Sequence, residues 1–336
     1  MKKSIVSIFI ILLIVSCHHD SLKVDVSNVV IPELTINRLE QDVFNMDTTH
    51  LLLSANKLKT KYGRFYNSYV MGILNNGGSH DTSKADLLKL FIRDKDMQDA
   101  YSNCQKVYPD VNNLKDEFTQ SFKYFKNYFP NRPIPKVITM MSGFNYSIVT
   151  QDSTLAIGLE MYLGSDNKFY PALGMPRYKS MFMNKENILP DALRAWMINE
   201  FPYMMNKNDL LSEIIYMGKI MYLTDALAPD VADTLKMQYT NKQSQYCKQN
   251  EFNVWSYFIA QKLLYSTDQQ EIMKFTTDGP FTTAFSKEAP PRIGYWIGRQ
   301  IIKQYVKNNP SVSLQQLMDE KDAQKILMKA KYKPSK

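Results

Sequence analysis

The stretch 189–230 carries two carboxylates, Glu200 and Glu213, on helix faces that are otherwise apolar. Glu200 follows Leu193 and Met197 at helical spacing, so the three side chains share one face. Glu213 lies in a segment that is apolar nearly all round and is therefore expected to be buried. A carboxylate in such a place can ligate a metal ion, activate water as a general base or pair with a buried cation.

Two helices must position these carboxylates. The periodicity predicts one helix over about 189–200 and a second over about 210–223, joined by the polar link 206–209. Pro202 disfavours the helical conformation at the residue before it and lacks a backbone donor, so the first helix should end or kink just after Glu200. The result is a helical hairpin with both carboxylates directed inward.

This arrangement resembles one class of zinc metallopeptidases, in which a His-Glu-x-x-His helix is followed by a helix that supplies a third ligand from a Glu. Asn199, Glu200 and Tyr203 stand at the three motif positions, and Glu213 stands at the downstream Glu. Asn and Tyr are poor replacements for the two imidazoles that would hold zinc. The chain has four histidines, and all precede this stretch: His18, His19, His50 and His80. We therefore predict a degenerate site with no metal, no cofactor and no catalytic residue.

The two carboxylates then need other partners, since buried charges are rarely left unpaired. We expect an Arg, Lys or Tyr to neutralise them. Gly294 and Gly298, four residues apart, predict a helix that packs closely against the hairpin. Arg292 and Arg299 on that segment are the candidate partners of Glu200 and Glu213. A carboxylate-only Ca²⁺ or Mg²⁺ site is the alternative, but it requires more oxygen ligands than the neighbouring sequence supplies.

The N-terminus has the profile of a secretory signal. Residues 1–16 contain two early lysines and an apolar run that is too short to span a bilayer. Ile14-Val15-Ser16-Cys17 resembles a bacterial lipobox, which predicts acylation of Cys17. Two or more acyl chains hold a protein stably on a membrane. We therefore expect a cell-envelope protein, anchored in the inner or outer membrane of a Gram-negative bacterium, with its body in the periplasm or at the surface.

The charge and the cysteine content indicate which binding partners and which disulfide to expect. The formal charge of +8 falls to +6 without Lys2 and Lys3, and the lysines are scattered through the predicted helices. Nucleic acid is therefore not an expected partner. An exported location permits a disulfide between Cys104 and Cys247, although spacing alone does not establish it.

The fold class expected is α+β, predominantly helical. We divide the chain into the signal peptide 1–16, a lipidated N-terminus and tether at 17–33, and one globular domain at 34–336. Within the domain we expect a helical half at 34–130, a small antiparallel sheet at 134–160 and a helical part at 189–332. A strand at 34–39 precedes the first helices, and helices at 231–248, 252–265 and 268–275 follow the hairpin. A small sheet ahead of such a hairpin resembles a zincin-like peptidase body.

Five motifs in this order carry a resemblance to a known family. They are Ile14-Val15-Ser16-Cys17, Asn37-Arg38-Leu39-Glu40, Ile157-Gly158-Leu159-Glu160-Met161-Tyr162-Leu163-Gly164, Leu211-Ser212-Glu213-Ile214-Ile215-Tyr216-Met217-Gly218-Lys219 and Pro291-Arg292-Ile293-Gly294-Tyr295-Trp296-Ile297-Gly298. Across nearly the whole mature chain they resemble the gliding-motility lipoprotein family of the GldB type.

That resemblance implies a non-catalytic envelope lipoprotein associated with gliding motility, held at the membrane through acylated Cys17 and in contact with other envelope proteins. A more distant similarity to His-Glu-x-x-His peptidases implies that a degenerate, peptidase-like groove serves as a binding or scaffolding surface. Two alternatives stay open. One is a lipid-anchored hydrolase with an altered, carboxylate-based metal site, and the other is a glycan- or lipid-binding envelope carrier.

Overall fold

A computed structural model describes residues 22–75 and 83–335 of the chain. The predicted signal peptide and Cys17 lie outside these residues, as do His18, His19 and His80. Among the described residues no helix is long and apolar enough to span a bilayer.

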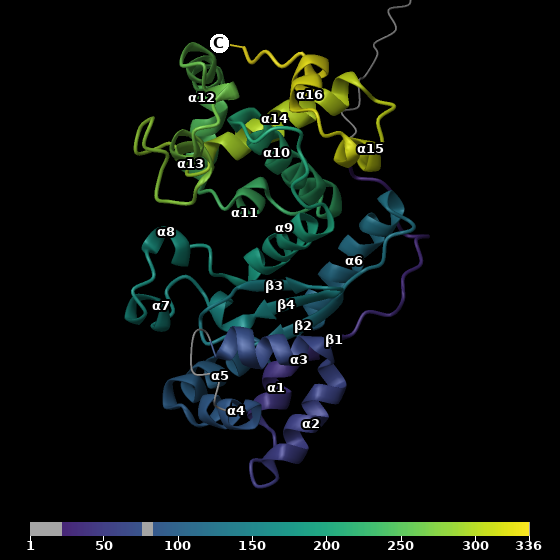
Figure 1. Cartoon of the computed structure of the whole chain (residues 1–336), viewed down its shortest axis with the longest axis vertical. Coiled ribbons are helices and arrows are strands. Elements are labelled where there is room, and N and C mark those ends of the chain that lie inside the picture. Colours follow the sequence, from purple (N-terminus) through teal and green to yellow (C-terminus); the bar gives the residue numbers. More distant parts are fainter. Residues whose placement is uncertain (1–21, 76–82, 336) are drawn as a thin grey trace, which may run out of the picture.

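A four-stranded sheet lies at the centre of the molecule (Figure 1). Its strands are β1 (Ile36–Arg38), β2 (Lys136–Met140), β3 (Ile148–Gln151) and β4 (Thr154–Gly158), arranged in the order β1-β2-β4-β3. β1 pairs parallel with β2 and β2 pairs parallel with β4, whereas β3 and β4 pair antiparallel. The antiparallel sheet predicted from the sequence is therefore wrong in two of its three pairings.

The connections explain the mixed sheet. A tight turn joins β3 to β4, and Asp152 in that turn adopts a left-handed φ of 49°. Between β1 and β2 the chain passes through the helices within residues 39–128, and a long helical crossover of this kind suits parallel pairing. β4 lies between β2 and β3, so these two strands, although consecutive in the chain, are not neighbours in the sheet.

The sheet separates two apolar cores. Along β2, Val137 belongs to the larger core, while Ile138 and Met140 belong to the smaller one. β4 alternates likewise, with Leu155 on the larger-core face and Ala156 on the other. Side chains of a strand alternate between its faces, so both faces of this sheet are buried.

The helices of the N-terminal half are α1 (Leu39–Phe44), α2 (Leu51–Tyr62), α3 (Arg64–Ser68), the π-helical turn η1 (Tyr69–Leu74), α4 (Lys84–Arg93), α5 (Lys95–Val107) and α6 (Asn112–Tyr128). Buried side chains of α1 to α4 and of η1 form the smaller core, whereas Ala100 and Cys104 of α5 and Phe118 of α6 belong to the larger core. Figure 1 places α2 to α4 on one side of the sheet and the C-terminal helices on the other.

The remaining elements surround the larger core. They are η2 (Leu159–Tyr162), α7 (Phe169–Ala172), α8 (Arg177–Ser180), η3 (Lys185–Asn187), α9 (Ile188–Glu200), α10 (Leu210–Leu227), α11 (Asp233–Met237), α12 (Asn241–Ala260), η4 (Leu263–Tyr265), α13 (Gln269–Thr276), α14 (Ile293–Asn308), α15 (Leu314–Asp319) and α16 (Ala323–Ala330). The helix break predicted near 248–252 is wrong. A capping box between Thr240 and Gln243 starts α12, and the polar residues that follow continue the helix.

The hairpin of α9 and α10 forms as predicted. α9 ends at Glu200, with Phe201 as its C-cap directly before Pro202. In α10 every residue except Glu213 is buried. Such a helix requires neighbours on all its sides.

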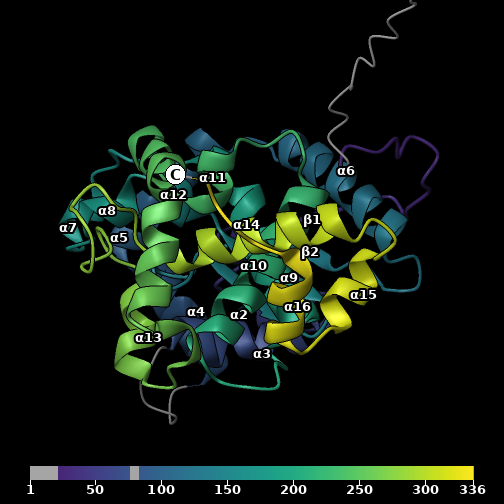
Figure 2. The same ribbon diagram turned by 90° about the horizontal axis from the view of Figure 1, so that it is seen from above.

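α14 is one of these neighbours, and the two helix backbones touch. A Cβ atom placed on Gly298 would lie 1.7 Å from the carbonyl oxygen of Ile214, and one on Gly218 would lie 2.4 Å from the carbonyl carbon of Gly298. Figures 1 and 2 both show α14 alongside α10. The close contact predicted from the glycine spacing is confirmed.

The segment before β1 packs on the body. Val26 is 3 % exposed and Leu34 is 6 % exposed, so both belong to the larger core. Lys23 forms an ion pair with Asp230 at 2.5 Å, and the Tyr128 hydroxyl donates to the carbonyl of Leu22. The part of the expected tether that the structure describes is thus attached to the globular domain.

Candidate functional site

Glu200 is paired, but not with the predicted arginines. Its Oε2 lies 3.2 Å from Nη1 of Arg132, and the Trp196 indole donates to Oε1 at 3.3 Å. The Arg132 guanidinium also stacks over the Phe201 ring, 4.3 Å from its centroid. Arg132 follows α6 and packs at the end of α9, which places a cation beside the last residue of that helix.

Glu213 has a different environment. The Tyr295 hydroxyl donates to its Oε1 at 3.4 Å. Burial raises the pKa of the Glu213 carboxyl, and the Tyr295 hydrogen bond only partly offsets that effect. The general prediction that an Arg, Lys or Tyr neutralises these carboxylates agrees with the contacts of both residues.

The other positions of the degenerate motif do not join a site. Asn199 is exposed, and the Tyr203 hydroxyl donates to the carbonyl of Lys207 at 2.7 Å. Within residues 22–75 and 83–335, no group of three or more His, Cys, Asp or Glu side chains is placed to hold a metal ion.

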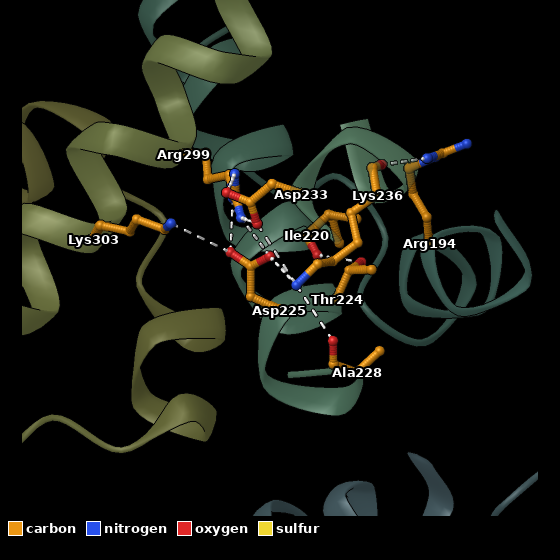
Figure 3. Close-up of polar contacts among 9 residues, drawn as sticks. All are labelled: Arg194, Ile220, Thr224, Asp225, Ala228, Asp233, Lys236, Arg299 and Lys303. Carbon is orange, nitrogen blue, oxygen red and sulfur yellow. Dashed lines mark hydrogen bonds and ion pairs between the residues drawn. The ribbon is translucent and has the colours of Figure 1, made fainter. Parts of the chain in front are cut away.

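Arg299 lies in a buried ionic network instead (Figure 3). It is 2 % exposed and holds Asp225 of α10 through two hydrogen bonds, of 2.7 Å from Nε and 2.6 Å from Nη2. Nη2 also donates to Asp233 at 2.6 Å. Lys236 approaches Asp225 to 3.1 Å, and Lys303 lies 4.0 Å from it. Sequence reasoning missed this network because Asp225 and Asp233 look like ordinary helix-end residues.

The same contacts determine the pKa of Asp233. Burial alone would raise its pKa, but the hydrogen bonds and charge of Arg299 outweigh burial and bring the pKa to about 2. The predicted pairing of Arg299 with Glu200 or Glu213 is therefore wrong, since the acidic residues nearer to it on α10 and α11 occupy its guanidinium.

Arg292 also has other partners. Its Nη2 donates to the carbonyl of Met237 at 3.2 Å, and Nε lies 3.5 Å from Oδ1 of Asp278. Nε itself is buried without a hydrogen bond among the described residues. Arg292 precedes α14 in a left-handed conformation with φ 53°, and its side chain contacts Met237 and Asp278 instead of the hairpin carboxylates.

Arg292 borders a cavity of about 270 Å³. The cavity lies where the segment 161–183, the start of α9, the end of α11 and the start of α14 meet. Tyr162 and Tyr178 supply aromatic walls, and Asp191 and Gln238 supply polar groups. An aromatic cavity with a few convergent polar side chains is typical of ligand-binding sites.

Asp191 is the buried carboxylate of this cavity. Gln238 Nε2 lies 2.9 Å from both of its oxygens, Arg194 donates to Oδ1 at 2.8 Å, and the Tyr162 hydroxyl donates to Oδ2 at 3.2 Å. Burial raises the pKa of Asp191, while the charge of Arg194 opposes this. Asp191 carried no functional signal in the sequence, because an Asp in the first turn of a helix normally indicates only a favourable helix-end charge.

Cys104 and Cys247 are both buried and free. Burial raises the pKa of each thiol. The disulfide that an exported location permits is not formed.

Fold and contacts together define a predominantly helical α+β protein whose hairpin carboxylates are hydrogen-bonded to Arg132, Trp196 and Tyr295 and which has a cavity beside Asp191 at the starts of α9 and α14. The sequence profile of the family described as Gliding motility protein GldB matches residues 19–334, so this chain belongs to that family. It is accordingly a gliding-motility lipoprotein of the cell envelope. No curated protein and no solved structure matches the chain.

Proposed function

We propose that this protein is a non-catalytic component of the gliding machinery that binds another envelope component through the cavity beside Asp191 and Arg292. Acylated Cys17 provides the membrane anchor in this proposal. The degenerate, peptidase-like groove over Glu200 and Glu213, and its zincin-like origin, stay predictions from resemblance.

The cavity is the observation that carries the proposal. Its buried carboxylate, Asp191, already accepts four hydrogen bonds, so it is poorly placed to take a proton from a substrate. The buried Nε of Arg292 makes no hydrogen bond among the described residues and lies 3.5 Å from Oδ1 of Asp278, a second carboxylate of the cavity lining. Such a site is suited to recognition rather than to turnover.

One feature favours the hydrolase alternative. Glu213 has a raised pKa and a single long hydrogen bond, which are properties of a general base.

A glycan- or lipid-binding carrier is the other alternative. It would use the aromatic walls of the cavity beside Asp191, which Tyr162 and Tyr178 supply.

Complementation of a strain that lacks the gene separates these functions. Tyr178→Ala with Lys179→Glu alters the cavity rim, where Tyr178 is half-buried and Lys179 is exposed. We expect this variant to lose colony spreading while it accumulates in the membrane fraction as the parent does. Glu213→Gln should retain spreading, and Cys17→Ser should lose membrane attachment.

The opposite pattern would contradict the proposal. Loss of spreading in Glu213→Gln, with unchanged protein amount and anchoring, would favour hydrolysis. Full spreading in the rim variant would show that the cavity does not serve this function.

A further inference from the structure

The positive charge of the chain is concentrated at its C-terminal end. Residues 293–336 contain nine Lys and Arg against three Asp and Glu, a net charge of +6. The mature chain from Cys17 onward also has a net charge of +6, so residues 17–292 are neutral as a whole. The sequence analysis treated the positive charge as scattered along the chain. The excess of positive over negative charge in fact lies within residues 293–336.

The tertiary structure brings part of this charge onto one surface. The side chain of Asn308 donates to the carbonyl of Ala330 at 2.7 Å, and that of Asn309 lies 3.4 Å from the carbonyl of Lys329. These contacts hold the end of α14 against the end of α16. The basic surface so formed consists of four exposed lysines: Lys307, Lys329, Lys331 and Lys333.

These lysines have no ionic partners within the described part of the chain. Of the nearby acids, Glu320 pairs with Lys325, Asp319 accepts from Gln315, and Glu251 accepts from the hydroxyl of Tyr332, which lies between Lys331 and Lys333. Lysines in a last helical turn are favoured by the helix dipole, which accounts for Lys307 and Lys329. It does not account for Lys331 and Lys333, which follow α16.

Exposed apolar side chains adjoin the basic surface. Met328 is 69 % exposed on α16, and Tyr265 is 56 % exposed at the end of η4. Both border one shallow depression, together with Asp322 and with Lys325, which is paired with Glu320. Met328 directly precedes Lys329, and exposed lysines beside an exposed apolar side chain suit the headgroup region of a bilayer.

The predicted lipid anchor lies close in sequence to the residues found at the same end of the body as α16. Figure 1 places the first described residues at the same end of the molecule as α15 and α16, and α2 at the opposite end. Cys17 precedes Leu22 by five residues, and a fully extended chain of five residues spans at most about 18 Å. A bilayer that holds the anchor is therefore close to this end of the body.

We propose that the basic surface at the ends of α14 and α16 binds anionic phospholipid headgroups, so that the body lies against the membrane that holds its anchor. The proposal rests on the lipid anchoring described above and adds a defined orientation. Lysines near an anionic membrane surface are attracted to it, and salt screens this attraction.

Fluorescence quenching in vesicles tests the orientation. The acylated, full-length mature protein carries an environment-sensitive fluorophore on Met328→Cys, since Cys104 and Cys247 are buried. It is reconstituted into vesicles of phosphatidylethanolamine and phosphatidylglycerol that contain a spin-labelled lipid. We expect quenching there, loss of most of it in vesicles of phosphatidylcholine, and loss of most of it at about 0.5 M salt. A fluorophore on Leu52→Cys in α2, 72 % exposed, is the control and should not be quenched.

A charge reversal and its matched control complete the test. Lys307→Glu, Lys329→Glu and Lys331→Glu together should abolish the quenching, while Lys57→Glu, Lys59→Glu and Lys95→Glu, exposed at the other end, should leave it unchanged. Equal quenching in neutral and anionic vesicles would overturn the proposal. So would absence of quenching at Met328→Cys in protein that co-sediments with vesicles, an outcome that would assign the surface to a protein or glycan. Failure to co-sediment at all would instead contradict the anchor.

Discussion

Arg299 of α14 holds both oxygens of the Asp225 carboxylate of α10, at 2.7 and 2.6 Å. Both side chains are almost fully buried, with exposed fractions of 2 % and 5 %. The pair joins two helices whose backbones are already in contact at Gly218 and Gly298. It therefore ties the last helical unit of the chain to the hairpin.

Removing the cation from this pair should be strongly destabilising. Arg299→Met leaves Asp225 buried with only Lys236 as a close partner, and loss of one member of a buried pair costs about 3–5 kcal/mol. Urea unfolding followed by circular dichroism measures the change. Arg177→Met, which removes an ion pair whose side chains are 68 % and 85 % exposed, should cost less than about 1 kcal/mol. Equal effects of the two substitutions would contradict the assigned role of Arg299.

Asp233 should make the protein sensitive to acid. Its pKa is about 2 in the folded state against an ordinary value of 3.8, so its stabilising effect is full above pH 4 and is lost as the pH falls toward 2. The free energy of unfolding of the parent should therefore decrease more steeply than that of Asp233→Asn in this window. Parallel curves for the two proteins would show that Arg299 does not depress the pKa of Asp233.

Gly298 should not tolerate a side chain. The Cβ of Gly298→Ala would meet the backbone oxygen of Ile214 at 1.7 Å, and because backbone cannot move aside cheaply, we expect a loss of about 2–3 kcal/mol or more. Gly72→Ala is the matched control, since nothing lies within 4 Å of the added atom. Thermal unfolding of both variants measures the difference. A neutral Gly298→Ala would mean that α10 and α14 are further apart than described.

The partner of Glu200 can be identified by a double-mutant cycle. Glu200→Gln and Arg132→Met should show a coupling of about 0.5–1 kcal/mol, because the pair is partly exposed, with side-chain exposures of 19 % and 33 %. The same cycle between Glu200 and Arg292 should show none. A coupling confined to Arg292 would restore the pairing expected from the sequence.

The local sequence pattern was sufficient to predict the hairpin of α9 and α10. The apolar spacing that leads to Glu200, the stop at Pro202 and the all-round apolarity of α10 depend on helix periodicity and backbone sterics, which act over a few residues. The two glycines of α14 predicted close helix contact for the same reason. The motifs spread along the chain also identified the family, which the match over residues 19–334 confirmed.

The tertiary structure determined which charged side chains pair and which strands are neighbours. Arg132 reaches Glu200 across 68 residues and Arg299 reaches Asp225 across 74, and the helical periods do not show which of several charged side chains will meet. The same holds for the sheet, where β4 lies between β2 and β3 and pairs parallel with β2, and where β1 pairs parallel with β2. The cavity beside Asp191 and the basic surface on α14 and α16 arise in this way. The cavity residues come from segments far apart in the sequence, and the lysines of the basic surface come from the ends of two helices, so only the packing of these segments brings them together.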